Sequence, residues 1–165
     1  MKGDLNTLKK VCMYASKVMF AGQIVLGIII ATIIVLKIGS LFFDSISELL
    51  TGWFRLDTGV PSFLETLLIL TMGFITLRII HGFMDSIYRD HSPFTNGNVV
   101  RLKSLGWTYL ISSVFLALLD FVSNSSVSDA LFLCLGSLLV SVVMYCLALV
   151  FRYGCLLQKE SDETL

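Results

Sequence analysis

The sequence HSPFTNGNVVRLKSLGW, residues 91–107, is the one long polar interruption in the second half of a strongly apolar chain. It separates two pairs of hydrophobic segments, so its position decides how the chain is divided. Ser92 before Pro93 is typical of a helix N-cap followed by a proline at the first helical position. Thr95, three residues before Asn98, offers a second cap. We therefore expect a helix to restart within this stretch.

Composition indicates that the solvent of this chain is lipid. Apolar residues make up 56% of the 165 residues and charged residues 15%, against about 25% charged in ordinary globular domains. The mean hydropathy is +0.86, which fits a bilayer environment. The formal net charge is zero and no basic stripe is present, so we expect no direct contact with nucleic acid.

Four apolar segments are long enough to cross a bilayer as helices, which takes about 20 residues each. They cover residues 18–36, 63–84, 105–122 and 130–151. The turn between the third and fourth segments is short and polar, so these two spans should be antiparallel neighbours. In the fourth span, Ser137 and Ser141 form a small-xxx-small pair that lets a neighbouring helix approach closely. The predicted fold is an all-α integral membrane protein, a four-helix transmembrane bundle in a single domain of residues 1–165.

The basic residues are unevenly distributed between the two sides of the predicted bundle. Ten of the twelve Lys and Arg residues lie in the N-terminal segment, the region from Arg78 to Lys103 and the tail, and only Lys37 and Arg55 lie on the opposite side. The positive-inside rule therefore predicts that both termini are cytoplasmic. The expected location is the inner cell membrane, with a multi-pass topology and the lipid bilayer as the immediate partner.

Three polar segments lie outside the predicted spans. Residues 86–104 are interpreted as a cytoplasmic hinge, and residues 152–165 as a cytoplasmic tail. Over residues 41–55, in the first outer loop, apolar residues recur on one helical face and polar residues on the other. This pattern predicts an amphipathic helix that lies in the outer membrane interface.

The sequence contains no pattern that indicates catalysis, a metal site or a cofactor. The two histidines, His81 and His91, are too few for a multi-histidine metal centre, and no HExxH, GxSxG or GxxxxGK[ST] motif is present. The four cysteines show neither a CxxC spacing nor a cluster with histidine, so we interpret them as packing residues. We expect a protein that is not an enzyme and that holds no metal and no cofactor.

One group of candidate functional residues is ionisable and lies in or near the second span. Its members are Glu65, Arg78, His81 and Asp85. The last three are spaced i, i+3 and i+7, which places them on one face of a helix, where His81 and Asp85 could pair. Ionisable side chains in a span usually face protein or water. The four residues are therefore either an intramembrane polar cluster that serves a proton or ion, or charges that simply end the span.

The hinge and the tail share a pattern with a known family. The hinge has SPFT at 92–95, Asn98, Leu102 and GW at 106–107, and the tail region has VFRYG at 150–154 and LQKESDET at 157–164. Taken together, these motifs resemble the DUF2975 family, small four-span prokaryotic membrane proteins of unknown function. The resemblance covers essentially the whole chain. It implies a bacterial four-helix membrane protein that is frequently encoded beside a small helix-turn-helix regulator, and it brings no activity, substrate or cofactor.

The function that we favour is a small binding or regulatory membrane module that presents a cytoplasmic surface to a soluble partner, such as a helix-turn-helix regulator. The candidate partner-binding residues come from the hinge and the tail: Ser92, Pro93, Phe94, Thr95, Asn98, Arg152, Gln158 and Glu160. One alternative is a small homo-oligomeric exporter that uses the ionisable group of the second span. Another is an immunity-type protein against membrane-active peptides, which would use the outer loop.

Overall fold

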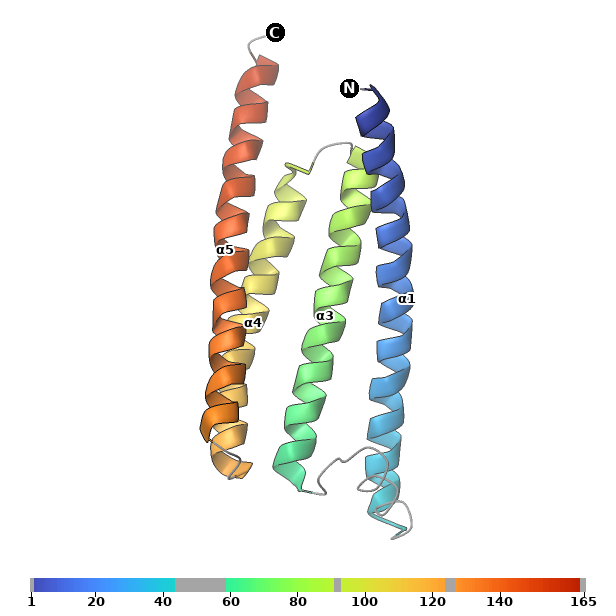
Figure 1. Ribbon diagram of the computed structural model, residues 1–165, viewed down its shortest axis with the longest axis vertical. Helices are drawn as coiled ribbons and strands as arrows, with labels where there is room; N and C mark the ends of the chain where they lie inside the picture. Colours follow the sequence, from blue (N-terminus) through green and yellow to red (C-terminus); the bar gives the residue numbers. More distant parts are fainter. Residues whose placement is uncertain (1, 44–58, 91–92, 124–126, 164–165) are drawn as a thin grey trace.

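The computed structural model describes residues 2–43, 59–90, 93–123 and 127–163. These residues form α1 (Lys2–Ser40), α3 (Val60–Asp90), α4 (Asn96–Ser123) and α5 (Val127–Glu163). Figure 1 shows the helices as long rods lying side by side, with both chain ends at the same end of the molecule as the α3–α4 connection. We call this the hinge end. Of the interfacial helix predicted over residues 41–55, only 41–43 are described, and they form a turn after α1.

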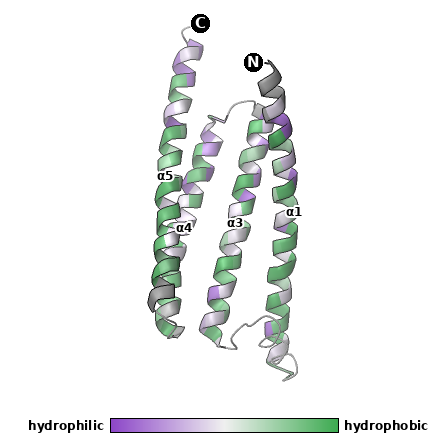
Figure 2. Ribbon diagram, in the orientation of Figure 1, coloured by the Kyte–Doolittle hydropathy of each residue, from purple (hydrophilic) through white to green (hydrophobic). Residues whose placement is uncertain are grey.

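Each of these helices is long and apolar enough to cross a membrane, which confirms the predicted all-α, four-span architecture. The helices also continue past the predicted spans, most of all at the hinge end, where the hydrophilic residues gather (Figure 2). Lys, Glu and Gln are good helix formers in water, so a helix does not have to end where the lipid ends. Of the predicted hinge 86–104, residues 86–90 belong to α3 and residues 96–104 to α4.

One of the two predicted caps starts α4. The backbone N–H of Asn98 donates to Thr95 Oγ1 at 3.3 Å and to Thr95 O at 3.0 Å, so Thr95 is the N-cap that its spacing from Asn98 predicted. The expectation that Pro93 begins the helix is wrong, because Pro93 lies in a bend before α4 starts at Asn96. Ser92, the other predicted cap, lies outside the described residues.

Within the described residues, the helix backbones approach one another in chain order: α1 packs on α3, α3 on α4 and α4 on α5. The α1–α3 contact brings small residues against large ones, with Gly22 facing Leu77 and Gly73 facing Leu26. The α4–α5 contact is tighter. Ser141, which is buried, donates its hydroxyl to the backbone carbonyl of Gly106 at 2.7 Å.

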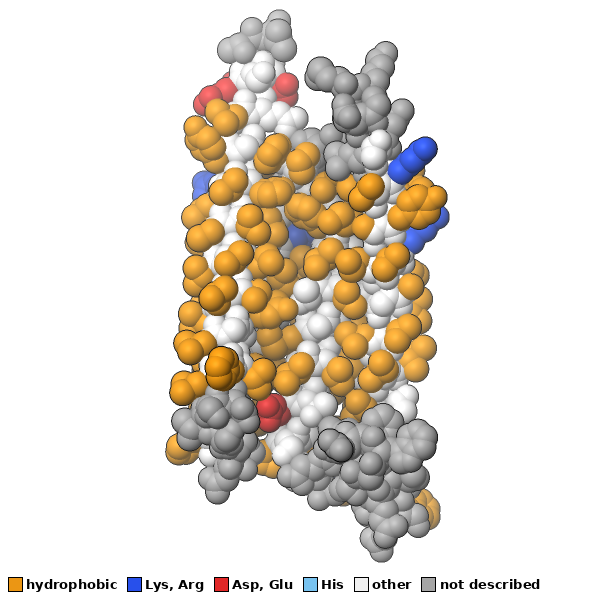
Figure 3. All heavy atoms as spheres, viewed as in Figure 1, with side chains coloured by type: hydrophobic (Ala, Val, Ile, Leu, Met, Phe, Trp, Pro, Cys, Tyr) orange, Lys and Arg blue, Asp and Glu red, His pale blue; other side chains and the backbone are white. Residues whose placement is uncertain are grey.

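Basic residues mark where the apolar part of the bundle ends. In α1, Lys17 and Lys37 enclose an uncharged stretch of about 30 Å at 1.5 Å per residue, the thickness of a bilayer core. Arg101 lies against Gly82 of α3, and Arg152 directly follows Phe151, whose ring contacts Phe83 of α3. Arg101 of α4 and Arg152 of α5 therefore lie at a similar level along the bundle, the level of Gly82 and Phe83 in α3. We call this level the hinge-end boundary, and Figure 3 shows the Lys and Arg side chains near it.

Candidate functional site at the hinge end

The ring of Phe94 lies on α5 and ties the α3–α4 connection to the last helix. Its centroid is 5.4 Å from that of Phe151, and a Cβ added to Gly154 would overlap the ring. Phe151 also lies 5.5 Å, centroid to centroid, from Phe83 of α3. Tilted aromatic pairs of this kind contribute about 0.5–1.5 kcal/mol each beyond the area they bury. Through this aromatic cluster, side chains of α3 and α5 meet at the hinge end, although the two helix backbones, as far as the structure describes them, do not pack directly on each other.

A recess lies directly beside this cluster, between the start of α4 and the end of α5. It has a volume of about 380 Å³ and a mostly polar lining. One wall is made by Phe94, Thr95 and Asn96, and the other by Cys155, Gln158, Lys159 and Asp162. The second wall is a single face of α5, because its residues are spaced i, i+3, i+4 and i+7. We call this recess the hinge groove.

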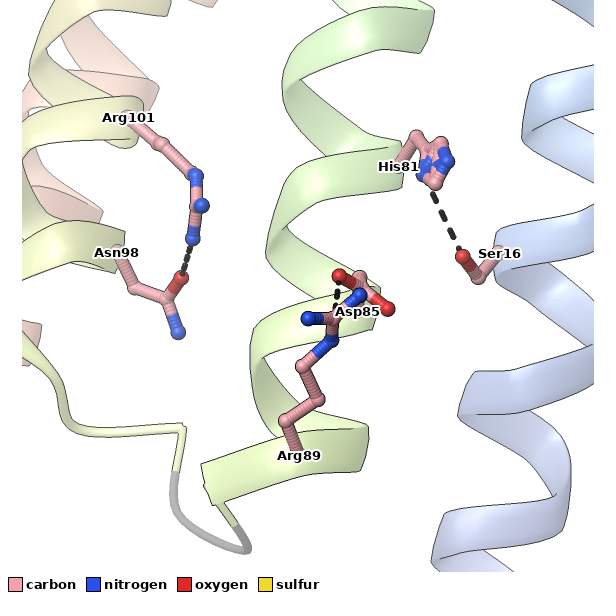
Figure 4. A network of polar contacts seen from close by, with 6 residues as sticks. All are labelled: Ser16, His81, Asp85, Arg89, Asn98 and Arg101. Carbon is pink, nitrogen blue, oxygen red and sulfur yellow. Dashed lines mark hydrogen bonds and ion pairs between the residues drawn. The ribbon is translucent and has the colours of Figure 1, made fainter.

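Asn98 supports the floor of the site, although it does not line the groove. Its side chain is fully buried. Nδ2 donates to the carbonyl oxygen of Pro93 at 3.0 Å. Oδ1 accepts from Nη1 of Arg101 at 2.9 Å, as Figure 4 shows. A buried amide is stable only when its polar atoms are paired, and here both ends of the amide are. Asn98 thereby holds the backbone that carries Phe94.

The structure brings part of the predicted partner-binding set together. Phe94, Thr95 and Gln158 line the hinge groove, whereas Arg152 is exposed on α5 and does not line it. Glu160 lies two residues from Gln158, which places it on the opposite face of α5. Pro93 and Asn98 act beneath the groove, as hydrogen-bond partners of each other.

Sequence reasoning missed four residues of the groove, namely Asn96, Cys155, Lys159 and Asp162. Three of them could have been found, because they share one helical face with Gln158. Lys159 also reaches Glu163 at 3.6 Å, but both side chains are largely exposed. A surface pair of this kind contributes about 0–1 kcal/mol, so it does little to hold Lys159 in place.

The ionisable group of the second span is dispersed along α3. His81 Nδ1 lies 3.4 Å from Ser16 Oγ of α1, and the His81 ring meets Phe20 edge-on at 5.5 Å. Asp85 pairs with Arg89 at 3.0 Å, in place of the suggested pair with His81 (Figure 4).

The other two members of that group lie apart from this contact. Arg78 is exposed, and Glu65 lies toward the opposite end of α3. Among the described residues, no group of three or more His, Cys, Asp or Glu side chains is placed to hold a metal ion.

Four apolar helices and a polar surface confined to their ends define a multi-pass membrane protein. The family model of DUF2975, proteins of unknown function, matches residues 55–165, so the chain belongs to this family. The match includes α3, α4 and α5 and confirms the resemblance seen in the sequence. Comparison with curated proteins and with solved structures finds no match.

Proposed function

We propose that this protein is a binding module that docks a soluble cytoplasmic protein in the hinge groove. The observation that carries the proposal is the groove itself, a polar recess beside the part of α5 that continues past the hinge-end boundary. From Arg152 to Glu163, α5 extends by about 16 Å at 1.5 Å per residue, which is enough to leave the headgroup region. A soluble protein can reach this recess without entering the lipid.

The chemistry of the groove favours a protein partner over a small apolar ligand. Lys159 and Asp162 offer one charge of each sign, and the Gln158 amide both donates and accepts hydrogen bonds. Phe94 adds an aromatic surface that is 40% exposed. Aromatic residues surrounded by polar groups are typical of the residues that dominate binding energy at protein interfaces. The gene neighbourhood that the family resemblance implies points to a helix-turn-helix regulator as this partner.

Removing one groove charge should release the partner. We expect Lys159→Gln and Asp162→Asn each to lower recovery of a co-purifying soluble protein by about tenfold, equivalent to about 1.4 kcal/mol. The measurement is quantitative co-purification from native membranes in mild detergent, at matched expression. Glu160→Gln is the control, because it removes a charge from the opposite face of the same helical segment. Equal recovery with all three variants would contradict docking in the groove.

The groove serves a cytoplasmic partner only if the hinge end faces the cytoplasm. We expect reporter fusions at both termini to show cytoplasmic activity, since ten of the twelve Lys and Arg residues belong to that side. The check is a pair of reporters, one active only in the cytoplasm and one active only outside it, fused in turn to each end. An active outside reporter at either terminus would reverse the topology and remove the proposed role.

The two alternatives have less support from the geometry. An exporter that uses Glu65, Arg78, His81 and Asp85 would need these side chains close together. Glu65 and Arg78 are about 20 Å apart along α3 at 1.5 Å per residue, and His81 is turned toward α1. The immunity-type role depends on residues 41–55, which lie mostly outside the described part of the chain.

A further inference from the structure

The guanidinium of Arg101 lies between α4 and α3 at the hinge-end boundary. Its Nη1 donates to Asn98 Oδ1 at 2.9 Å (Figure 4). Asn98 in turn donates from Nδ2 to the Pro93 carbonyl. On the other side, a Cβ added to Gly82 of α3 would lie 3.1 Å from Arg101 Nε. Because Gly82 has no side chain, the guanidinium can lie directly against the α3 backbone. Arg101 is thus held in place from both helices.

Within the described residues, Arg101 has a neutral amide as its partner and no carboxylate. Asp85 lies three residues beyond Gly82 on α3, but its carboxylate is paired with Arg89 at 3.0 Å. A guanidinium has five N–H donors, and the bond to Asn98 uses one of them. A half-buried guanidinium with its charge uncompensated and most of its donors unused is suited to bind an anion.

Arg78 supplies a second cation at the same seam. It lies four residues before Gly82, and therefore one turn deeper on the same face of α3. Its side chain is exposed, and within the described residues it forms no ion pair. A long cationic side chain that starts just inside the lipid extends toward the headgroups. Figure 3 shows cationic atoms set back in the recess between the two helix pairs, near the hinge end.

The height of this pair matches the level of lipid phosphates. Lys103, two residues after Arg101, and Asp120 enclose an uncharged stretch of α4 of about 26 Å at 1.5 Å per residue, close to the thickness of a bilayer core. Arg101 therefore stands where the hydrocarbon ends and the headgroups begin. Basic sites between transmembrane helices at this level are a known arrangement for anionic headgroups.

We propose that Arg101 and Arg78 bind the phosphate of an anionic phospholipid at the seam between α3 and α4. Arg101 is the fixed donor, because Asn98 and Gly82 hold its plane, and a guanidinium can bind two phosphate oxygens at once. Arg78 adds a second positive charge from the lipid side. The acyl chains lie along apolar side chains on the same helical faces as the two arginines, such as Ile75 of α3 and Phe115 of α4. This site is separate from the hinge groove and does not depend on the protein partner.

The test is a lipid titration of the full-length protein, purified and delipidated in neutral detergent, followed by native mass spectrometry. Phosphatidylglycerol and phosphatidylcholine with the same acyl chains are the two probes. We expect the first phosphatidylglycerol to bind about tenfold more tightly than phosphatidylcholine, and Arg101→Gln to abolish that preference. Lys103→Gln is the matched control, because it removes the same charge two residues along α4, from the other face of the helix. This control should leave the preference unchanged.

Two further measurements test the role of Arg78 and distinguish a lipid from a water-soluble ligand. Arg78→Gln should weaken phosphatidylglycerol binding about threefold, and this exposed side chain can be replaced without loss of folding if Arg101→Gln proves unstable. Addition of inorganic phosphate should not displace the lipid. The proposal is overturned if the two lipids bind the wild type equally, or if Arg101→Gln and Lys103→Gln behave alike. It is also overturned if Arg78→Gln binds phosphatidylglycerol as the wild type does, or if inorganic phosphate competes, which would indicate a water-soluble ligand.

Discussion

Replacing Gly106 by leucine is expected to separate α4 from α5 and to lower the free energy of unfolding by about 3 kcal/mol. A Cβ at this position would lie 3.3 Å from the carbonyl oxygen of Ser141 and 3.6 Å from the backbone nitrogen of Tyr145. Both are backbone atoms, which cannot rotate away as a side chain can. The whole helix must move to make room.

Movement of α5 would also break the hydrogen bond from Ser141 Oγ to Gly106 O, 2.7 Å long and buried. In lipid, helices associate through close packing and polar contacts of this kind. The hydrophobic effect does not drive them together, because lipid tails are as apolar as the helix surfaces. Gly106 and Ser141 together are therefore expected to contribute more to the α4–α5 contact than the larger apolar residues around them.

The measurement for Gly106→Leu is unfolding of the purified protein in bicelles, and α5 supplies a matched control glycine. A Cβ added to Gly136 meets nothing within 4 Å, so Gly136→Leu should change the stability by less than about 0.5 kcal/mol. Both substitutions replace a helical glycine by the same residue, so the difference between them reports packing alone. Similar losses from both variants would show that Gly106 is not a special contact.

Asn98→Ala is expected to have the next largest effect, a loss of about 3 kcal/mol together with loss of order in the segment that carries Phe94. The substitution leaves the Pro93 carbonyl without the Nδ2 donor at 3.0 Å, and it leaves Arg101 without its Oδ1 acceptor. Asn98 is fully buried, so water cannot simply replace these bonds. One substitution should therefore weaken both the hinge groove and the Arg101 site.

Thermal unfolding and limited proteolysis near residues 93–95 are the two measurements for this variant. Asn98→Asp is an informative comparison, because it keeps an oxygen for Arg101 and loses the donor to Pro93. We expect it to be less damaging than Asn98→Ala. Thr95→Ser retains the hydroxyl that caps α4 and should behave as the wild type does. Wild-type stability and protease resistance in Asn98→Ala would remove the supporting role of this residue.

Much of the fold could be predicted from the sequence. Predominantly apolar runs of about 20 residues have few alternatives to membrane-spanning helices, because the lipid core leaves every unpaired backbone group unsatisfied. The Thr95 cap was predictable as well, since one side chain and one N–H three residues later are enough to make it. The Pro93 prediction was wrong, although the same local rules supported it. A nearby cap that starts the helix at Asn96 leaves Pro93 in the bend.

The sequence by itself determined the number of helices, their order and which chain segments share an end, because length and polarity are properties of each segment alone. Only the tertiary structure decided which face of each helix meets its neighbour. Many lipid-facing side chains are apolar, as are those between helices, so no amphipathic stripe marks the rotation of a span. Three features depend on that rotation: the contact of Gly106 with Ser141, the packing of Arg101 against Gly82 and the two walls of the hinge groove.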